Sequence, residues 1–472
     1  MRVSSVDFSE HVISKIAEKR TPADLTRPLP EKREMDRPRE SRATRLKVLF
    51  LITTFPLSSE TFIQREIRCL RNLPVEIDLY SLWGGANEFE GLKVNRFPKW
   101  RLIALLWRLP YWMARKPSAF INLGKHLFER RVKTPLDFGM TLVGIFFAVC
   151  YASHFSQPEN RPQIIHAAWA TMPATAAQLL RVLLKIPFSF QAHAYDIFRN
   201  GGDWLLPSKL RESSLIIVST KYGRESLISR GGDASRIAMI RQGIDEFPPQ
   251  KTLRKKRAPL RILSVGRLIE KKGFSDQLAL LAELKRSGLE FEARIVGGGR
   301  CAKALTSQWS QLCLNGTVQL LGPRPNGLVI EQLQWADVFI YTGKQLANGD
   351  SDGLPNVIAE AMAVGVPVVS TGVAGVREAI TDEQTGVLMR NLDHNAWRSA
   401  LERLRDDDEY YMGISKKARA WVNTNFDART NVSHICHQWR VLLTRAKTSS
   451  SLYSVNSLNN PSIASHAASC DD

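Results

Sequence analysis

Residues 348–380 read NGDSDGLPNVIAEAMAVGVPVVSTGVAGVREAI. A short turn, Gly353-Leu354-Pro355-Asn356, leads into an apolar helical segment. The run PVVST that follows is short and rich in branched residues, which is typical of a buried parallel strand. A turn, a helix and a parallel strand in this order indicate an open α/β sheet, whose ligands bind at the carboxyl ends of the strands.

The alternation of strand and helix occurs in two halves of the chain. In the first half the apolar runs are LKVLFLIT, VEIDLYSLW, PQIIHAAWA, PFSFQAHAY and SSLIIVST, and in the second they are LRILSVG, FEARIVGGG, TVQLLG, DVFIYTG and PVVST. Each run has the length of a buried strand, and helical patterns separate most of them. The Pro- and Lys-rich stretch 247–259 lies between the halves and is predicted to be a linker.

We therefore predict an α/β protein with two doubly wound domains on either side of a cleft. The first domain is expected at residues 45–250 and the second at 258–425, followed by a closing helix at 426–447. Residues 1–44 mix charged residues with proline, and residues 448–472 are rich in Ser and Asn, so both are predicted to be disordered tails. The first tail lacks the apolar segment of a secretory signal.

Composition and charge narrow the class of protein. The chain has 472 residues, of which 44% are hydrophobic, and this excludes both a single small module and a globally disordered chain. The 65 Lys and Arg outnumber the 46 Asp and Glu, and the net charge of +19 favours anionic partners: nucleic acid, phosphorylated small molecules or an acidic membrane. The six cysteines form no C-x-x-C pair, so a reducing, cytoplasmic compartment is expected.

Two segments bear on a membrane. Segment 139–155 carries no Lys, Arg, Asp or Glu, but it is shorter than the ~20 apolar residues of a spanning helix, so we expect a buried core helix. In segment 96–120, Trp100, Trp107 and Trp112 lie among Lys and Arg without an acidic residue. Such a segment suits either a helix in an anionic lipid interface, on the cytoplasmic membrane face, or a surface helix that packs its tryptophans on the core.

The turn in 348–380 is a candidate anion site, because free backbone N–H groups at a helix start attract phosphate. The predicted phosphate-binding residues are Gly353, Leu354, Pro355 and Asn356. Asp352 precedes the helix and Glu360 lies about one turn into it, where it could accept hydrogen bonds from sugar hydroxyls. The alternative is that Asp352 caps the helix and Glu360 is solvated, but a Glu in an otherwise apolar helix is costly if it is buried without a partner.

The segment VGRLIEKKGFSDQL follows the first strand of the second half. Arg267 and Lys272 lie five residues apart across a strand-to-helix turn, and Gly266 and Gly273 leave room for a close ligand. Two such cations could stabilise a leaving nucleoside diphosphate, although they could also be solvated. No Asp-x-Asp lies at a strand end of the first half, so neither a metal nor another cofactor is predicted.

Two further candidates lie in the first half. The segment PFSFQAHAYDIF places His193 and Asp196 just after a strand, where the histidine could contact a ligand or be structural. The loop TTFPLSSETFIQREI, residues 53–67, could bind substrate, or its Thr61 and Gln64 could simply form a capping box. The candidate residues of the loop are Ser59, Glu60 and Thr61.

These motifs resemble those of the retaining nucleotide-sugar glycosyltransferases of family four, which have the GT-B fold of two facing Rossmann-like domains. That family has acid-Gly-x-Pro, four residues, Glu-Ala-Met-Ala and then Gly-x-Pro-Val; here the acid is Asp352, the second motif starts at Glu360 and the third at Gly365. The first acid is often Glu in the family. The string SSETF is similar to the one found in family members that build bacterial exopolysaccharides such as colanic acid. The resemblance covers about residues 46–443.

The resemblance implies an enzyme that moves a hexose from a nucleoside diphosphate sugar to a lipid-linked or growing saccharide. Arg267 and Lys272 would bind the donor phosphates, and Glu360 would bind the ribose. His193 and Asp352 would be catalytic residues that hold the transferred hexose. The departing phosphate would take the proton of the acceptor, and the loop at residues 59–61 would close on the diphosphate.

Other functions remain open at this point. A nucleotide-sugar epimerase or a glycan phosphorylase can share the two-domain architecture. A basic, non-catalytic scaffold is a further alternative, although the retained Arg267, Lys272 and Glu360 argue against it. Nucleic-acid binding is disfavoured, because the basic residues are interleaved with Trp and Leu in one segment and no recognised nucleic-acid module is present.

Overall fold

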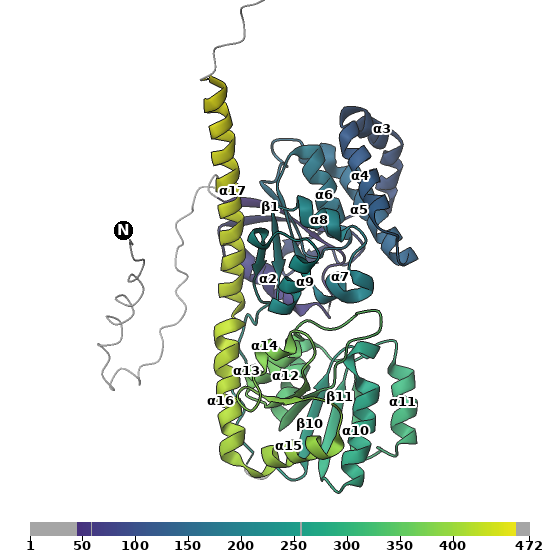
Figure 1. The fold of residues 1–472 in the computed structure, drawn as a ribbon, viewed down its shortest axis with the longest axis vertical. Coiled ribbons are helices and arrows are strands. Elements are labelled where there is room, and N and C mark those ends of the chain that lie inside the picture. Colours follow the sequence, from purple (N-terminus) through teal and green to yellow (C-terminus); the bar gives the residue numbers. More distant parts are fainter. Residues whose placement is uncertain (1–44, 58, 255–256, 459–472) are drawn as a thin grey trace, which may run out of the picture. The chain divides into compact units, whose positions relative to one another are not determined.

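Parallel strands form two sheets, one in each half of the chain (Figure 1). The computed structural model describes residues 45–57, 59–254 and 257–458. The predicted tail at residues 1–44 therefore lies outside the described residues, as does the end of the second tail. The two doubly wound α/β domains expected from the sequence are confirmed, and we call them the N lobe and the C lobe.

The N lobe is built on a seven-stranded parallel sheet. Its strands are β1 (Leu46–Ile52), β2 (Val75–Ser81), β5 (Asn95–Arg96), β6 (Ile164–Ala167), β7 (Phe188–Ala192), β8 (Leu215–Val218) and β9 (Ile237–Met239), in the order β5-β2-β1-β6-β7-β8-β9. A separate hairpin pairs β3 (Glu88–Phe89) with β4 (Leu92–Lys93). The helices are α2 (Thr61–Arg71), α3 (Leu105–Arg115), α4 (Pro117–Glu129), α5 (Pro135–Phe155), α6 (Met172–Leu184), α7 (Ala194–Phe198), α8 (Leu206–Glu212) and α9 (Lys221–Ser229), with 3-10 turns η3 (Lys99–Ala104), η4 (Arg199–Gly201) and η5 (Ala234–Arg236).

The C lobe is built on a six-stranded parallel sheet. Its strands are β10 (Leu260–Val265), β11 (Phe291–Val296), β12 (Val318–Gly322), β13 (Val338–Tyr341), β14 (Val368–Thr371) and β15 (Val387–Met389), in the order β12-β11-β10-β13-β14-β15. The helices are α10 (Phe274–Arg286), α11 (Ala302–Gln311), α12 (Asn326–Trp335), α13 (Asn356–Val364), α14 (Val376–Ala379), α15 (His394–Asp406) and α16 (Asp408–Asn425), with the 3-10 turn η6 (Glu270–Lys272). The last helix is α17 (Ala428–Leu458).

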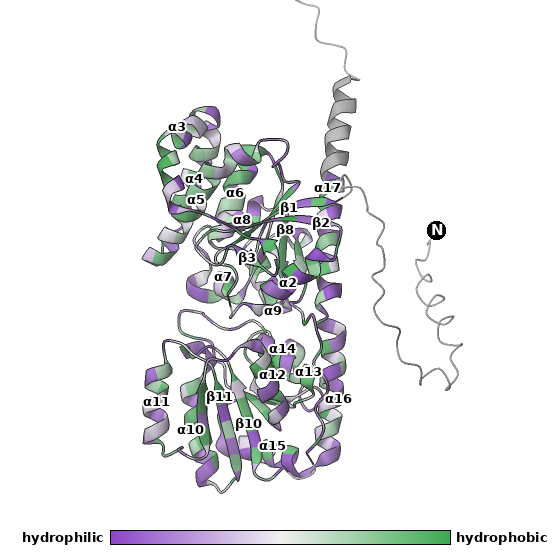
Figure 2. Ribbon diagram, turned by 180° about the vertical axis from the view of Figure 1, so that it is seen from behind, coloured by the Kyte–Doolittle hydropathy of each residue, from purple (hydrophilic) through white to green (hydrophobic). Residues whose placement is uncertain are grey.

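Both faces of the N-lobe sheet are buried, which explains why its strands read as continuous apolar runs (Figure 2). Side chains alternate along a strand, so Val48 and Phe50 of β1 pack in one cluster with residues of α2 and α17. Leu49 and Leu51 point the other way and pack with residues of α5 and α6. The sheet is therefore held between two helical layers.

Helix α5 contains the expected core helix at 139–155. By length and composition it could cross a membrane, but half of its most apolar window is buried in the protein. Phe147, Ala152 and Phe155 are fully buried against the N-lobe core. Gly144 allows close contact with α6, because a Cβ there would lie 2.6 Å from the carbonyl oxygen of Met172. The C-terminal part of α5 is thus a structural element of the lobe.

The second half of the described chain ends in a helix that crosses back to the N lobe (Figure 1). On α17, Trp439 is fully buried, and its indole N–H donates to the hydroxyl of Ser189 in β7 at 3.1 Å. The expected closing helix therefore exists, but it runs to Leu458 and the prediction of disorder from residue 448 was wrong over this part. The physical reason is that residues 448–458 contain neither proline nor glycine, which would have stopped the helix.

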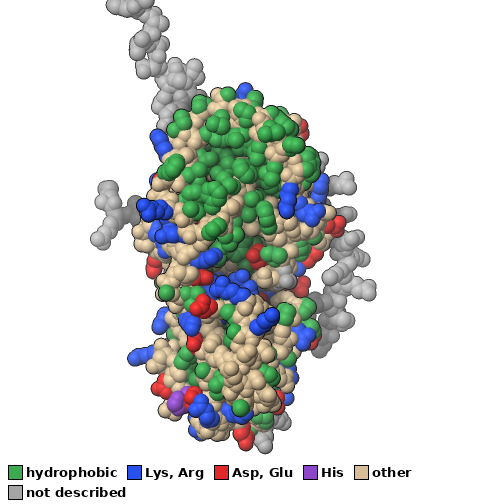
Figure 3. Space-filling view, turned by 90° about the vertical axis from the view of Figure 1, so that its right-hand side faces the viewer, with side chains coloured by type: hydrophobic (Ala, Val, Ile, Leu, Met, Phe, Trp, Pro, Cys, Tyr) green, Lys and Arg blue, Asp and Glu red, His purple; other side chains and the backbone are tan. Residues whose placement is uncertain are grey.

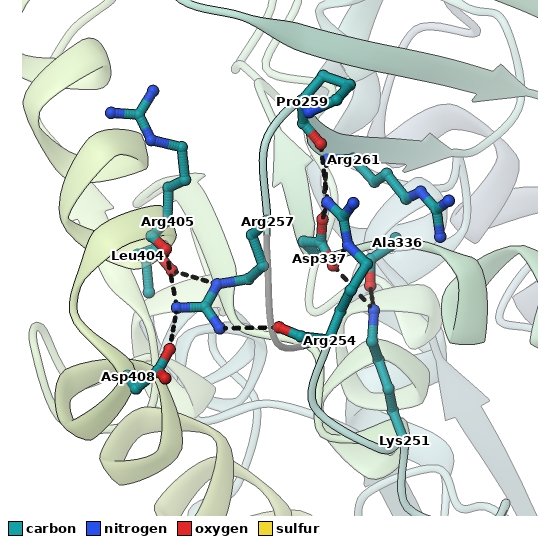
Figure 4. Close-up of polar contacts among 10 residues, drawn as sticks. All are labelled: Lys251, Arg254, Arg257, Pro259, Arg261, Ala336, Asp337, Leu404, Arg405 and Asp408. Atoms are coloured by element: carbon teal, nitrogen blue, oxygen red, sulfur yellow. Dashed lines mark hydrogen bonds and ion pairs between the residues drawn. The ribbon is translucent and has the colours of Figure 1, made fainter.

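The stretch 247–259 is not a free linker, because its basic side chains bind a buried carboxylate of the C lobe (Figure 4). Asp337, just before β13, is fully buried. It accepts hydrogen bonds from Lys251 Nζ at 3.2 Å, from Arg254 Nε at 3.3 Å and from the backbone N–H of Arg261 at 3.0 Å. A second bond from Arg254 reaches its other oxygen. The described part of this stretch is therefore docked on the lobe.

Arg257 adds a second attachment in the same stretch (Figure 4). Its buried guanidinium donates to the carbonyl oxygens of Leu404 at 3.1 Å and Arg405 at 2.8 Å, at the end of α15. It also forms an ion pair with Asp408 at 2.5 Å, but that side chain is 66% exposed. The cations that suggested a solvated linker in the sequence are instead used as structural hydrogen-bond donors.

We predict that Asp337→Asn lowers the free energy of unfolding by about 3 kcal/mol, because it leaves Lys251 and Arg254 without the charge that balances them in a buried site. Urea unfolding followed by far-UV circular dichroism measures this change. Asp408→Asn is the matched control, since the partner it removes is mostly exposed and should cost less than about 1 kcal/mol. Equal losses in the two variants would contradict the structural role assigned to Asp337.

Candidate functional site

A cleft between the two lobes has a cavity of about 550 Å³. The predicted site residues in its wall are Ser59, Thr61, His193, Arg267, Lys272, Asp352, Gly353, Leu354, Pro355, Asn356 and Glu360. Glu60 lies beside them, close enough to Arg267 for the two charges to interact. The structure therefore brings the predicted positions together at one site, while their chemical roles stay predictions.

The turn before α13 leaves the start of this helix open toward the cleft. Pro355 is the N-cap residue, and no side chain caps the helix, so the alternative in which Asp352 caps it is wrong. Gly353 and Asn356 line the cavity on either side of this helix start. Unpaired N–H groups and the positive end of the helix dipole make this turn suitable for a phosphate group.

Asp352 is bound to cations and to a tyrosine rather than to the helix. Its carboxylate forms ion pairs with Lys272 at 2.5 Å and with Lys271 at 3.4 Å, and it accepts a hydrogen bond from the Tyr341 hydroxyl at 2.5 Å. Burial alone would raise the pKa of Asp352, but Lys272, Lys271 and Tyr341 outweigh it and hold this pKa well below its ordinary value. Asp352 is therefore an anion that orients Lys272.

The two predicted phosphate-binding cations differ in their surroundings. Lys272 is tied to Asp352, whereas Arg267 is exposed and forms no ion pair within the described residues. The turn between them depends on Gly273, which has φ +72° and whose Cβ would lie 1.9 Å from the carbonyl oxygen of Thr342. The sequence predicted that Gly273 leaves room for a ligand. In the structure, glycine is required at this position by the positive φ and by the close contact with the Thr342 backbone.

Glu360 is buried and paired with the opposite lobe. Arg65 of α2 forms an ion pair with Glu360 Oε1 at 2.8 Å, and both side chains are almost fully buried. Arg65 also lies 3.5 Å from Asp245, which Arg68 contacts at 3.0 Å. The alternative of a solvated Glu360 is therefore wrong, and the side chain is held at the cavity wall by a fixed partner.

His193 is held by two hydrogen bonds at the start of α7. Its Nε2 lies 3.0 Å from the carbonyl oxygen of Ala168, and its Nδ1 lies 3.3 Å from Gln242 Nε2. These partners are consistent with Nε2–H as donor and Nδ1 as acceptor. Burial lowers the pKa of His193 to about 4, so the ring is neutral near pH 7. The ring also packs against Trp169, with ring centroids 4.4 Å apart.

Asp196 does not orient the imidazole of His193. Its carboxylate accepts hydrogen bonds from the backbone N–H groups of His193 and Ala170, both at 3.1 Å. Burial raises its pKa to about 7. Asp196 therefore has a structural role, because it fixes the backbone at the start of α7. The sequence alone could not distinguish this role from a catalytic one.

The loop before α2 does not form the capping box that Thr61 and Gln64 suggested. Helix α2 has no side-chain cap, and Gln64 Nε2 instead donates to the carbonyl oxygen of Leu57 at 2.8 Å. This bond holds the loop that presents Ser59 and Thr61 to the cavity. Burial raises the pKa of Glu60 to about 7, although Arg267 and Trp169 act in the opposite direction.

Three site residues were missed from the sequence: Arg65, Lys271 and Tyr341. Tyr341 is the last apolar residue of the run DVFIYTG, so its place at the carboxyl end of a strand was a usable signal. Lys271 was not predicted, because the neighbouring Lys272 matches the Lys-Gly motif of the family. Arg65 gave no signal, because its partner Glu360 lies 295 residues further along the chain.

No group of three His, Cys, Asp or Glu side chains within the described residues is arranged as metal ligands would be. The expectation that the site works without a metal or another cofactor is not tested by this observation and stays a prediction.

Two family models match the chain one after the other. The model for Glycosyltransferase Family 4 matches residues 59–246, which form most of the N lobe. The model for glycosyl transferases group 1 matches residues 246–421, which include the candidate anion-binding turn at residues 353–356. Together they span both walls of the cleft.

Similar proteins cover nearly the whole fold. The amylovoran biosynthesis glycosyltransferase AmsK of Erwinia amylovora is 28% identical over 402 residues, which cover 81% of this chain and 96% of AmsK. WcaL of Escherichia coli K12, named for colanic acid biosynthesis, is 28% identical over 404 residues, with 81% and 96% covered. The crystal structure of Anabaena HepE with UDP-glucose matches the fold with a TM-score of 0.61 at 19% identity, covering 84% of this chain and 100% of HepE.

We predict that Glu60 makes nucleoside diphosphate binding weaker at alkaline pH. With a pKa of about 7, Glu60 is neutral below this pH and becomes an anion beside Arg267 above it, where it would repel a diphosphate. Between pH 6 and pH 8 the affinity of wild type for UDP should fall about threefold to tenfold relative to Glu60→Gln. Titration calorimetry on both proteins measures this ratio, in which the ionisation of the nucleotide itself cancels. A pH-independent ratio would contradict the prediction.

Proposed function

Because this chain belongs to the family-four glycosyltransferases and has the GT-B fold, we propose that it is a retaining enzyme that transfers a hexose from a nucleoside diphosphate sugar to a saccharide. The observation that carries the proposal is one cavity wall in which the open start of α13 lies together with Arg267 and Lys272. A helix start and two cations form a site for a diphosphate. Its opposite wall, from the N lobe, is left for the acceptor.

The donor diphosphate would lie at the turn Gly353-Leu354-Pro355-Asn356, within reach of Lys272 and Arg267. Lys272 is already oriented by Asp352 and needs no large rearrangement to meet a phosphate oxygen. Charge that develops on the leaving diphosphate would be stabilised by these cations and by the N–H groups of the helix start. Glu360 would accept hydrogen bonds from the ribose through Oε2, because Oε1 is used by Arg65.

A retaining transfer in which the leaving phosphate takes the proton of the acceptor fits the state of the acidic side chains. Asp352 is an anion engaged by two lysines and a tyrosine, which lowers its ability to attack the sugar as a nucleophile. Its proposed role is to position the hexose and Lys272. His193 lines the same cavity as a neutral ring and would contact the hexose from the N lobe.

The acceptor would be a lipid-linked or growing saccharide in the synthesis of an exopolysaccharide or another cell-surface glycan. The similar proteins AmsK and WcaL are named for amylovoran and colanic acid biosynthesis, and both cover most of the chain. The loop with Ser59, Glu60 and Thr61 would close on the donor diphosphate from the acceptor side. We propose that the reaction takes place on the cytoplasmic face of the membrane, where such an acceptor is held.

We predict that Lys272→Ala and Glu360→Ala each lower kcat/KM for transfer at least about a hundredfold, because each removes a contact to the donor that matters in the transition state. The measurement is the release of nucleoside diphosphate from UDP-, GDP- and ADP-sugars with saccharide acceptors. Glu360→Gln is included because Glu360→Ala leaves Arg65 buried without a partner. Lys303→Ala, at an exposed position of α11, is the control and should retain activity. Full activity of either Lys272→Ala or Glu360→Ala would refute the assignment.

The same assay separates the proposed reaction from its alternatives. Transfer requires an acceptor, whereas epimerisation of the donor sugar proceeds without one, and a phosphorylase requires inorganic phosphate. A folded protein that shows no thermal shift with any nucleoside diphosphate would favour a non-catalytic scaffold, because a bound ligand raises stability by mass action.

A further inference from the structure

The segment between β5 and β6 exposes many large apolar side chains. They lie on η3, α3, α4 and the start of α5, and we call this surface the apolar face (Figure 3). Side chains that are more than half exposed include Trp100, Ile103, Leu106, Trp107, Ile121 and Phe128. Monomeric soluble proteins seldom expose a continuous apolar surface of this kind, so a partner is expected to cover it.

Helix α3 is apolar on two sides, and only one of them meets the protein. Leu105, Leu109 and the 4%-exposed Trp112 pack on the N-lobe core. On the opposite side, Leu106 and the 58%-exposed Trp107 point outward. Because α3 has large apolar side chains on this second side as well, a partner is expected to cover that side. The expectation that this segment packs its tryptophans on the core therefore holds for Trp112 and fails for Trp107.

Within residues 91–128, which include η3, α3 and most of α4, all the charged side chains are cations. Between Glu90 and Glu129 the chain contains no Asp or Glu, whereas it contains eight Lys and Arg. None of these eight cations forms an ion pair with another residue in the described part of the chain. Figure 3 shows Lys and Arg side chains at the border of the apolar surface. Apolar side chains bordered by unpaired cations match a bilayer with anionic headgroups.

A basic pocket adjoins the apolar face at Trp100. Its cavity of about 850 Å³ is lined by Lys93, Arg96, Lys99 and Arg101, together with Trp100, which is 71% exposed. The Arg101 guanidinium stacks over the ring of Tyr151, 4.5 Å from its centroid, which holds this cation at the pocket wall. Arg96 Nη1 donates to the carbonyl oxygen of Gly85 at 3.1 Å. The pocket therefore presents several partly oriented cations.

One carboxylate, Asp78, also lines the basic pocket. Asn95 Nδ2 donates to it at 2.9 Å, and its pKa is raised by burial. A single carboxylate does not balance four cations, so the pocket keeps a net positive charge and suits an anionic group such as a phosphate.

We propose that the apolar face docks on an anionic lipid bilayer, with the basic pocket binding the phosphate of a lipid headgroup. The inference rests on the proposed function only for the membrane-held acceptor, which docking would bring near the N-lobe side of the cleft. A second copy of the chain is a poorer occupant, because two surfaces with the same unpaired cations repel each other. Helix α5 supports docking rather than spanning, since half of its apolar window is buried in the lobe.

Flotation of the full-length protein with vesicles tests the docking. The vesicles are phosphatidylcholine alone, or phosphatidylcholine mixed with phosphatidylglycerol. Wild type should float with the mixed vesicles, and the double variant Leu106→Glu/Trp107→Glu should lower the bound fraction more than about tenfold. Met412→Glu is the matched control, because Met412 is a 41%-exposed apolar side chain on α16 of the other lobe. It should float like wild type.

The basic pocket is tested with a charge variant. Arg96→Glu/Lys99→Glu should lower binding to mixed vesicles more than about tenfold, whereas Lys303→Glu, on α11, should change it less than about twofold. Soluble glycerol 3-phosphate at matched ionic strength should not release the protein from vesicles, because the headgroup acts together with the apolar face. Release by this soluble phosphate, with no loss in Leu106→Glu/Trp107→Glu, would assign the pocket to a free phosphate ligand and overturn the proposal.

No flotation of wild type with mixed vesicles, or equal flotation of all variants, would overturn the proposal. A dimer in analytical ultracentrifugation that Leu106→Glu/Trp107→Glu abolishes, without flotation of wild type, would assign the apolar face to a second copy. Thermal shift with UDP on the same variants distinguishes a failure of the docking proposal from a failure of the proposed transfer reaction. Normal nucleotide binding without flotation refutes docking alone, and flotation without nucleotide binding refutes the transfer reaction alone.

Discussion

The buried ion pair between Arg65 and Glu360 is the interaction on which the arrangement of the cleft depends. It joins α2 of the N lobe to α13 of the C lobe at 2.8 Å, next to the candidate anion-binding turn. A buried charge without a partner is costly, so the two lobes are favoured in the position that keeps this pair together. Arg241 and Glu378 form a second pair across the lobes at 3.0 Å. Through these pairs, the carboxyl ends of both sheets border one cavity, and residues that are distant in the chain form one site.

In and beside that cavity, the surrounding protein sets the ionisation of Asp352, Glu60 and His193. The anion Asp352 holds Lys272, while Glu60 beside Arg267 has a pKa near neutrality because it is buried. His193 is neutral for the same reason. In the proposed reaction, Lys272 and the N–H groups at the start of α13 would stabilise the leaving diphosphate with little reorganisation, because Asp352 and the helix already orient them.

The N lobe combines this internal site with an outward-facing apolar surface. Helix α5 joins this surface to the core of the lobe, since its C-terminal part is buried while its first turn, with Leu136, is exposed. The core half keeps α3 and α4 attached to the lobe, and their outer sides are left uncovered. An enzyme that takes a membrane-held acceptor gains from such a surface, because docking replaces a search in solution by a search along the membrane.

The sequence by itself determined the two parallel sheets and most of the cavity wall. Continuous apolar runs predict strands that are buried on both faces of a sheet. The turn before Asn356 is predicted from its own residues, Gly353, Leu354 and Pro355. Neither prediction requires knowledge of a tertiary contact. Only the tertiary structure decided that Arg65 pairs with Glu360, that the basic stretch 247–259 is docked on Asp337, and that α17 continues to Leu458. It also decided that Trp112 packs inward while Trp107 faces outward. These features depend on contacts between distant residues, and where both sides of a helix are apolar, its periodicity cannot tell which side meets the core.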